Sequence, residues 1–288
     1  MRDFALAAGF VVIWASAFTA IRGIVPEWPA LWGLAARFVL VTPLLLAVVV
    51  IWRRPSLPSR ADCWRLAAMG MFGSAGYLAG AWMGAQVLPT GLVALLAATT
   101  PLFVAGGEVA FLRRRLPGLA WGGLALGWLG VAVLGVGRGA LEVRADQFWG
   151  MTWVLGGAMA QALGILAFAP ARGRLDPWLA NAGQAAVAAL TLLALASLLQ
   201  PGLPPPPSTT LLWTLAYSVL VVGGAGYALF FVMLRRFPAA SAASMQLLAP
   251  PLATIFGWAL LGEALGWTDL LGGMVTLGGL LLLFRARR

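Results

Sequence analysis

The sequence predicts an all-α integral membrane protein, and two observations lead to that fold class. Of the 288 residues, 61% are hydrophobic and 10% are charged, whereas soluble domains are about 45–50% apolar and about 25% charged. The apolar residues form continuous runs of about 18–22 residues, the length a helix needs to cross roughly 30 Å of hydrocarbon. A membrane barrel would instead show segments of about ten residues with alternating polarity. We therefore expect transmembrane helices that satisfy their own backbone hydrogen bonds.

Ten segments of the chain satisfy this length rule. Residues that favour turns separate them, including Arg53 to Pro58, Pro117-Gly118 and the stiff loop from Pro201 to Pro207. The expected membrane helices are 4–22, 31–52, 66–86, 91–112, 119–137, 148–169, 178–199, 210–234, 239–261 and 268–285.

The loop arginines indicate how the chain is oriented in the membrane. The sequence has no lysine and no histidine, so arginines carry all of its positive charge, which leaves a net charge of +10. Alternate loops carry 15 arginines on one face and three on the other, and cytoplasmic loops are enriched in such residues. We therefore expect both termini in the cytoplasm, which requires an even number of spans. Arginines scattered over short loops do not form the basic patch that binds nucleic acid.

The second part of the chain repeats the first. A shift of 150 residues places Thr100-Pro101 onto Pro250-Pro251 and Gly123 onto Gly273. We expect one membrane domain made of two five-helix repeats, at residues 1–140 and 141–288. Because five is odd, the second repeat enters the membrane in the opposite sense. Inverted repeats of this kind are a recurrent plan of secondary transporters, with the substrate site near the membrane midplane.

Short motifs in this order resemble the drug/metabolite transporter superfamily, and they are most similar to its ten-span EamA-type members, the YddG-like exporters of amino acids and other metabolites. The motifs are Trp14 to Phe18 followed by Arg22, Ala36-Arg37-Phe38, Ala94 to Leu102, and Leu261-Gly262-Glu263 ahead of a glycine-rich last helix. The resemblance implies export of a small solute. The first repeat departs from the pattern at Leu112-Arg113-Arg114, where the carboxylate of Leu-Gly-Glu is lost.

Missing residue types exclude several activities. Without lysine the chain has no Walker A loop, so we expect no ATP hydrolysis. One cysteine and no histidine provide neither a zinc site nor the usual base for a serine nucleophile, so we expect no metal, no cofactor and no enzyme activity. Abundant alanine and glycine, with arginine as the sole basic residue, are typical of a GC-rich bacterial genome. We therefore expect the protein in a bacterial inner membrane.

The leading hypothesis is an alternating-access exporter of small organic metabolites, with amino acids, aromatic and apolar ones among them, as the expected substrates. Two alternatives stay open: a flippase or scaffold subunit for lipid or lipid-linked substrates, and an intramembrane enzyme. Because the duplication lies within one chain, the pore does not depend on a second copy, and we expect a monomer.

Polar side chains inside spans should face the bundle interior, because exposure to lipid is costly. An apolar pocket with aromatic walls and a few polar groups suits a partly apolar organic solute. For each such residue, an ordinary hydrogen bond between helices is the alternative. The expected cavity residues are Trp14, Ser16, Thr19, Tyr77, Trp82, Thr100, Gln161, Gln184, Tyr227 and Gln246.

Prolines at equivalent repeat positions predict paired kinks. Pro101, Pro250 and Pro251 each remove a backbone donor, which bends a helix and frees carbonyl groups. We expect these kinks to line the cavity and to flex as it opens, and a static bend is the alternative. By contrast, the spacing of Gly76, Gly80 and Gly84 indicates close packing against a neighbouring helix.

Three charged residues lie within or beside the expected spans. Arg37 lies inside the span 31–52 and either binds an anionic group or pairs with Glu263. Glu108 lies one turn from the cytoplasmic end of 91–112, where it either snorkels toward the basic turn at 113–115 or couples transport to protons.

Overall fold

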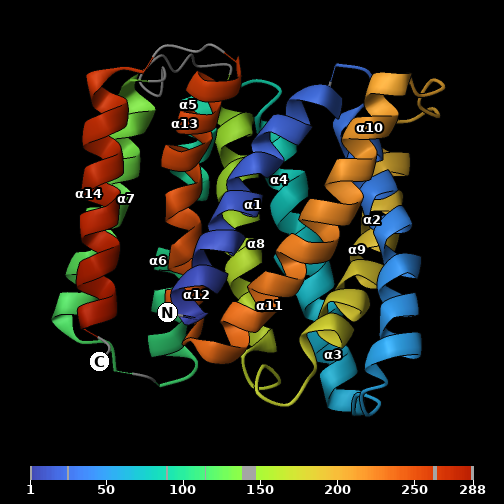
Figure 1. Cartoon of the computed structure of the whole chain (residues 1–288), viewed down its shortest axis with the longest axis horizontal. Coiled ribbons are helices and arrows are strands. Elements are labelled where there is room, and N and C mark those ends of the chain that lie inside the picture. The colour runs from blue at the N-terminus through green and yellow to red at the C-terminus, as the bar shows by residue number, and fades with distance from the viewer. Residues whose placement is uncertain are drawn as a thin grey trace.

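The protein is helical throughout the part that the computed structural model describes, which is residues 2–24, 26–88, 90–113, 115–137, 147–261 and 265–286 (Figure 1). Helix forms within each of the segments that the apolar runs predict. The elements up to residue 137 are α1 (Arg2–Ile24), α2 (Ala30–Ala47), η1 (Val48–Arg53), α3 (Arg60–Ala68), η2 (Met69–Gly76), α4 (Tyr77–Gly84), α5 (Thr90–Ala97), α6 (Thr100–Ala110) and α7 (Gly118–Gly137). The elements from residue 148 are α8 (Phe148–Phe168), α9 (Pro177–Leu199), α10 (Thr209–Tyr217), η4 (Ser218–Gly226), α11 (Tyr227–Arg236), α12 (Ala239–Ser244), η5 (Met245–Leu248), α13 (Ala249–Leu261) and α14 (Trp267–Arg285).

Seven helical stretches within the described residues are long and apolar enough to cross a membrane by length and composition. They are Ala30–Arg53, Leu92–Ala110, Gly118–Gly137, Phe148–Phe168, Pro177–Leu199, Thr209–Arg236 and Trp267–Arg285. The predicted spans 4–22, 66–86 and 239–261 are not among them. For 66–86 the reason lies in its composition, because five glycines, Ser74 and Tyr77 lower its hydropathy. Seven such helices already make this a multi-pass membrane protein.

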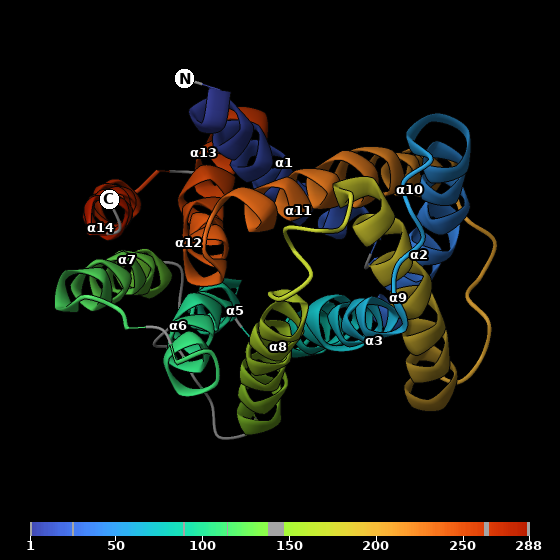
Figure 2. The same ribbon diagram turned by 90° about the horizontal axis from the view of Figure 1, so that it is seen from below.

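The helices run up and down through the body, and their packing defines two ends and a centre. Seen along the bundle, α7 and α14 lie side by side at one end, and α2 packs against α9 at the other (Figure 2). The centre contains α1, α6, α11 and α12. The start of α1, the end of α14 and the start of α3 lie on the same side of the body (Figure 1).

Two helical stretches are broken near their middle, and a proline follows each break. The α-helical bonding of α5 stops at Ala97, and α6 begins at Thr100 with Pro101 in its first turn. Likewise, α12 passes through the 3-10 turn η5 before α13 begins at Ala249. The prolines therefore lie in the first turn after each break, and their proposed flexing stays a prediction. The N–H groups in the first turn of a helix have no intrahelical acceptor, so a proline at that position costs no backbone hydrogen bond. The bend therefore comes from the break in the helix.

Small residues let the central helices approach closely, as the glycine spacing of 76–84 predicts. A methyl group added to Gly80 would lie 2.8 Å from the Cα of Gly157 on α8, and one added to Gly84 would lie 2.9 Å from the carbonyl oxygen of Gly150. Real carbon atoms do not approach so closely, so α4 packs on α8 only because these positions lack a Cβ.

Ion pairs tie the two parts of the chain together on the side where α3 starts. Asp62 Oδ1 accepts hydrogen bonds from Arg65 at 2.8 Å and from Arg174 at 2.7 Å, and Arg53 donates to Asp176 at 2.6 Å. Burial raises the pKa of Asp62, but hydrogen bonds from Ser59 and the two arginines lower it more, so this pKa lies below its ordinary value.

Candidate functional site

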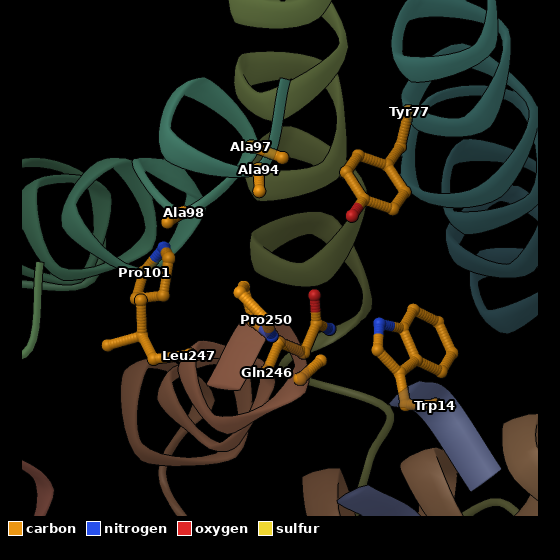
Figure 3. A pocket seen from close by; sticks show the side chains of 10 residues that line it. Trp14, Tyr77, Ala94, Ala97, Ala98, Pro101, Gln246, Leu247 and Pro250 are labelled. Carbon is orange, nitrogen blue, oxygen red and sulfur yellow. The ribbon is translucent and has the colours of Figure 1, made fainter. Parts of the chain in front are cut away.

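A pocket opens between α1, α4, α5 and the segment formed by η5 and α13 (Figure 3). It holds about 360 Å³ of space, open solvent included. The residues that line it are Trp14, Tyr77, Ala94, Ala97, Ala98, Pro101, Gln246, Leu247, Ala249 and Pro250. Its walls are mostly apolar, which is the character of sites that hold small organic molecules.

The two helix breaks place their residues on facing walls of the pocket. Ala98 and Pro101 flank the break between α5 and α6, while Gln246 lies in the 3-10 turn η5 and Pro250 in the first turn of α13. Within each segment these residues are three or four positions apart and therefore share one helix face. The methyl side chains of the neighbouring alanines leave the space between the two faces unfilled.

Three side chains supply the polarity of the pocket. The Trp14 indole, the Tyr77 hydroxyl and the Gln246 amide point toward one another across it (Figure 3). Gln246 Nε2 is buried and makes no hydrogen bond within the described residues. A buried donor without a partner costs free energy, because it has lost its hydrogen bonds to water. A ligand with an acceptor atom would remove that cost. None of the described lining residues is ionisable near neutral pH.

Trp14, Tyr77 and Gln246 thus come together in one pocket, along with Pro101 and Pro250, and their role in binding a substrate stays a prediction. Pro251 is not part of the lining. It faces α14 instead, where a methyl group on Gly273 would lie 3.6 Å from the Pro251 Cβ.

Ser16 lies outside the pocket lining, contrary to expectation. Its hydroxyl donates to the carbonyl oxygen of Ile13 at 2.7 Å and accepts from Tyr217 at 2.6 Å. Ser16 therefore joins α1 to α10. The side chain of Thr19 lies outside the described part of the structure.

Gln184 is likewise not in the pocket lining, because a buried network occupies it. It accepts from Ser74 at 2.5 Å and donates to Asn181 at 2.9 Å. Asn181 in turn donates to the carbonyl oxygens of Gly223 and Gly224, at 3.0 and 3.2 Å. This network links η2 to η4 through α9.

The other expected cavity residues are buried outside the pocket lining. These are Trp82, Thr100, Gln161 and Tyr227, each with a buried polar atom that has no hydrogen-bond partner within the described residues. The expectation fails here because polarity inside a span predicts an inward direction but not which interior surface the side chain reaches.

Arg37 is buried in α2, with an exposed fraction of 3%. Its guanidinium lies 5.3 Å from the ring centroid of Phe38 and 5.6 Å from that of Tyr227. Glu263, its expected partner, lies outside the described residues.

Glu108 does not snorkel, because it is fully buried. Its Oε1 accepts a hydrogen bond of 3.1 Å from the backbone N–H of Ala239, the first residue of α12. A carboxylate there accepts from a backbone N–H that has no acceptor within the helix, and it interacts favourably with the positive N-terminal end of the helix dipole. Glu108 therefore has a structural contact to α12, and its role in proton coupling stays a prediction.

Our sequence analysis did not predict the alanines of the lining, Ala94, Ala97, Ala98 and Ala249. A signal was present, because small residues precede a proline at equivalent positions of both halves. Alanine carries no chemistry, so its contribution of empty space becomes evident only once the helices are placed.

Comparisons with known proteins agree with this membrane fold. The model of the EamA-like transporter family matches residues 3–136 and 148–285. A solved crystal structure with 19% sequence identity superposes with a TM-score of 0.80, over 99% of this chain and 97% of that one. At that identity the likeness concerns the fold alone.

Several curated relatives are transporters by name. A protein of Streptantibioticus cattleyicolor named "Probable terminal-alkyne amino-acid exporter" is 28% identical, over 96% of this chain and 91% of its own length. The transporter YdfC of Bacillus subtilis is 26% identical, over 93% of this chain and 86% of its own. A WAT1-related chloroplastic protein of Arabidopsis thaliana is 26% identical over 92% of this chain, which spans 65% of that protein's length. The chain therefore belongs to the EamA-like transporter family and is a membrane transporter, not an enzyme.

Proposed function

We propose that the protein exports small organic metabolites, amino acids with apolar or aromatic side chains among them, by alternating access around the pocket at the two helix breaks. The observation that carries this proposal is the position of the pocket. It lies between a break before Pro101 and a second break before Pro250, at positions about 150 residues apart. Paired breaks around a binding site let one part of the bundle rock against the other.

The packing of the helices supports two inverted five-helix repeats, 1–140 and 141–288, and hence ten spans. A shift of about 150 residues places α2 on α9 and α7 on α14, and each of these pairs packs together. The same shift relates the packing of α8 on η2 and α4 to the packing of α1 on η4 and α11. The family match also divides at residues 136 and 148.

The protein is proposed to act as a monomer in a bacterial inner membrane, with both termini in the cytoplasm. The arginine distribution supports this orientation. The curated relatives include an inner-membrane transporter, YedA of Escherichia coli, which is 28% identical over 88% of this chain. The amino-acid substrate class is supported by the name of the Streptantibioticus relative and by a pocket that combines apolar walls with an amide, a phenol and an indole.

Uptake of radiolabelled amino acids into liposomes that contain the purified protein tests this function. The panel combines aromatic, aliphatic and charged amino acids, each with and without an imposed pH gradient. We expect saturable uptake of apolar amino acids above that of empty liposomes. Stimulation by the gradient would indicate proton coupling. A panel in which no solute moves faster than into empty liposomes would contradict the proposal and favour a lipid substrate.

A further inference from the structure

Arg37 is a buried cation for which the described part of the structure provides no anion. Among the described residues, its Nε has no hydrogen-bond partner, and the groups that contact its guanidinium are the rings of Phe38 and Tyr227. Within the described residues, no carboxylate forms an ion pair with it. A charge inside a membrane domain is costly and marks a functional position by default. Ring faces stabilise a guanidinium but leave its net charge unneutralised.

A chain of aromatic rings connects Arg37 to the pocket. The ring centroids of Tyr227 and Trp14 are 5.2 Å apart, and Trp14 lines the pocket. Tyr227 has an exposed fraction of 1% and Trp14 of 7%, so little water enters this wall. Charges act more strongly across such a medium than across water, because neither solvent nor salt screens them. The positive charge of Arg37 therefore reaches the pocket through two rings.

The pocket itself adds hydrogen-bond donors and no negative charge. Its polar side chains are the Trp14 indole, the Tyr77 hydroxyl and the Gln246 amide, whose Nε2 has no partner within the described residues. These groups face one another (Figure 3). An N–H or O–H donor forms its stronger bonds with an ionised acceptor, and a carboxylate offers two such oxygens. The described lining contains no carboxylate that would neutralise a cationic solute.

We propose that Arg37 determines the charge selectivity of this pocket. The pocket accepts solutes that combine a carboxylate with an apolar body, and it excludes organic cations of the same shape. The donors of the pocket hold the carboxylate, while Arg37 acts through its electric field from behind Tyr227 and Trp14. This inference rests on the proposed function, because it assigns a substrate class to the same pocket.

Four solutes that share a phenylalkyl body test this selectivity on the purified protein in detergent. Phenylalanine and 3-phenylpropanoate carry a carboxylate, whereas phenylalaninamide and 2-phenylethylamine carry only a positive charge. Ligand-dependent rises in melting temperature give the dissociation constants. We expect the two carboxylates to bind the unmodified protein and the two cations to bind at least about tenfold more weakly.

Substitutions at Arg37 assign this preference to its charge. We expect R37Q to weaken carboxylate binding about tenfold while leaving cation binding unchanged or stronger, and R37K to retain the preference. The control is R60Q, which removes an exposed cation at the start of α3 and should change neither class.

The inference is wrong if a folded R37Q protein keeps the ratio of carboxylate to cation affinity of the unmodified protein. It is equally wrong if the unmodified protein binds no carboxylate of the set, or binds the amines as tightly, and that result does not depend on whether R37Q folds. Failure of the proposed function would look different: carboxylates would bind selectively, yet none would cross the membrane of liposomes that contain the protein.

Discussion

Two adjacent glycines on α8 differ in what a methyl group would meet. At Gly157 an added Cβ would lie 2.9 Å from the carbonyl oxygen of Tyr77 and 3.2 Å from the Cα of Gly80. At Gly156 an added Cβ would meet no described atom of another helix within 4 Å, and the position is exposed. The pair therefore separates the cost of filling the α4 and α8 interface from the general effect of alanine on a helix.

We expect Gly157→Ala to destabilise the protein by about 1–3 kcal/mol, because the two backbones would have to move apart. Gly156→Ala should be neutral or stabilising, because alanine favours a helix by about 1 kcal/mol over glycine. Melting temperatures of the purified variants in detergent check both outcomes. Equal melting temperatures for the two variants would mean that α4 and α8 are not packed as described.

Asp62 contributes stability that depends on pH. Its pKa lies below the ordinary value of about 3.9, so folding favours the ionised form. The contribution is therefore fully present above the ordinary pKa and is lost as pH falls through the lowered value. We expect Asp62→Asn to lower the melting temperature at pH 7 by a small amount, about 1–3 °C.

The difference between Asp62→Asn and the unmodified protein should shrink as pH falls below about 4, because the carboxyl group is then protonated in both states. Arg60→Gln provides a control on the same turn of α3. A difference that stays constant from pH 7 to pH 3 would show that Asp62 acts by shape and not by charge.

At the scale of single residues, the structure brings some of the predicted cavity residues into one pocket and places others between helices. Trp14, Tyr77 and Gln246 are in the lining. Ser16 and Gln184 are instead bonded to neighbouring helices. Both outcomes satisfy the rule that polar groups avoid lipid, and only the rotation of each helix about its axis decides between them.

Two stretches of π-helix occupy corresponding elements in the two parts of the chain. η2 spans Met69–Gly76 and η4 spans Ser218–Gly226, about 150 residues later. The wider turns of a π-helix recur at functional sites. Asn181 donates to the carbonyl oxygens of Gly223 and Gly224 in η4, and it is joined through Gln184 to η2. One polar network thus fixes both stretches to α9.

We expect Asn181→Leu to lower the free energy of unfolding by about 1–3 kcal/mol. The Gln184 amide would lose its acceptor, and two buried carbonyl groups of η4 would lose their donor. The matched control is Gln161→Leu. Gln161 is equally buried, but its Oε1 has no hydrogen-bond partner in the described structure, so its loss should cost little. Thermal unfolding in detergent compares the two. If Gln161→Leu were the more harmful change, the network would not hold the π-helices.

At the scale of elements, sequence periodicity predicted where helices occur but not how they are interrupted. Nothing in the run from Met69 to Gly76 distinguishes a π-helix from an α-helix, because both satisfy the backbone within one segment. The prolines marked the breaks near Pro101 and Pro250. Their place in a first turn depends on packing that a one-dimensional pattern does not contain.

At the scale of the whole molecule, the length of the apolar runs predicted the helical membrane fold. The same pattern predicted less well which of the ten spans are apolar enough to be recognised as membrane helices from hydropathy alone. The predicted span 66–86 is rich in glycine because it packs against other helices, and close packing replaces hydropathy there. Family membership and a solved structure of the same fold agree with the overall plan.

The proposed orientation has a natural reporter, because the chain has one cysteine, Cys63, which is exposed near the start of α3. We expect a membrane-impermeant maleimide to label Cys63 in inverted vesicles but not in intact cells, since α3 starts on the arginine-rich side. A C63S/L203C variant moves the thiol to an exposed position of the opposite loop and should reverse the pattern. Labelling of Cys63 from outside intact cells would contradict a cytoplasmic arginine-rich face.

The most direct test of the central claim, an alternating-access carrier with its site between the two helix breaks, is counterflow in proteoliposomes. Liposomes that contain the protein are preloaded with unlabelled phenylalanine and diluted into a trace of labelled phenylalanine. The account predicts a transient accumulation of label above equilibrium, which Gln246→Ala abolishes and Gly156→Ala retains. Flux of label without such an overshoot would indicate a channel, and an overshoot that persists in Gln246→Ala would place the site elsewhere.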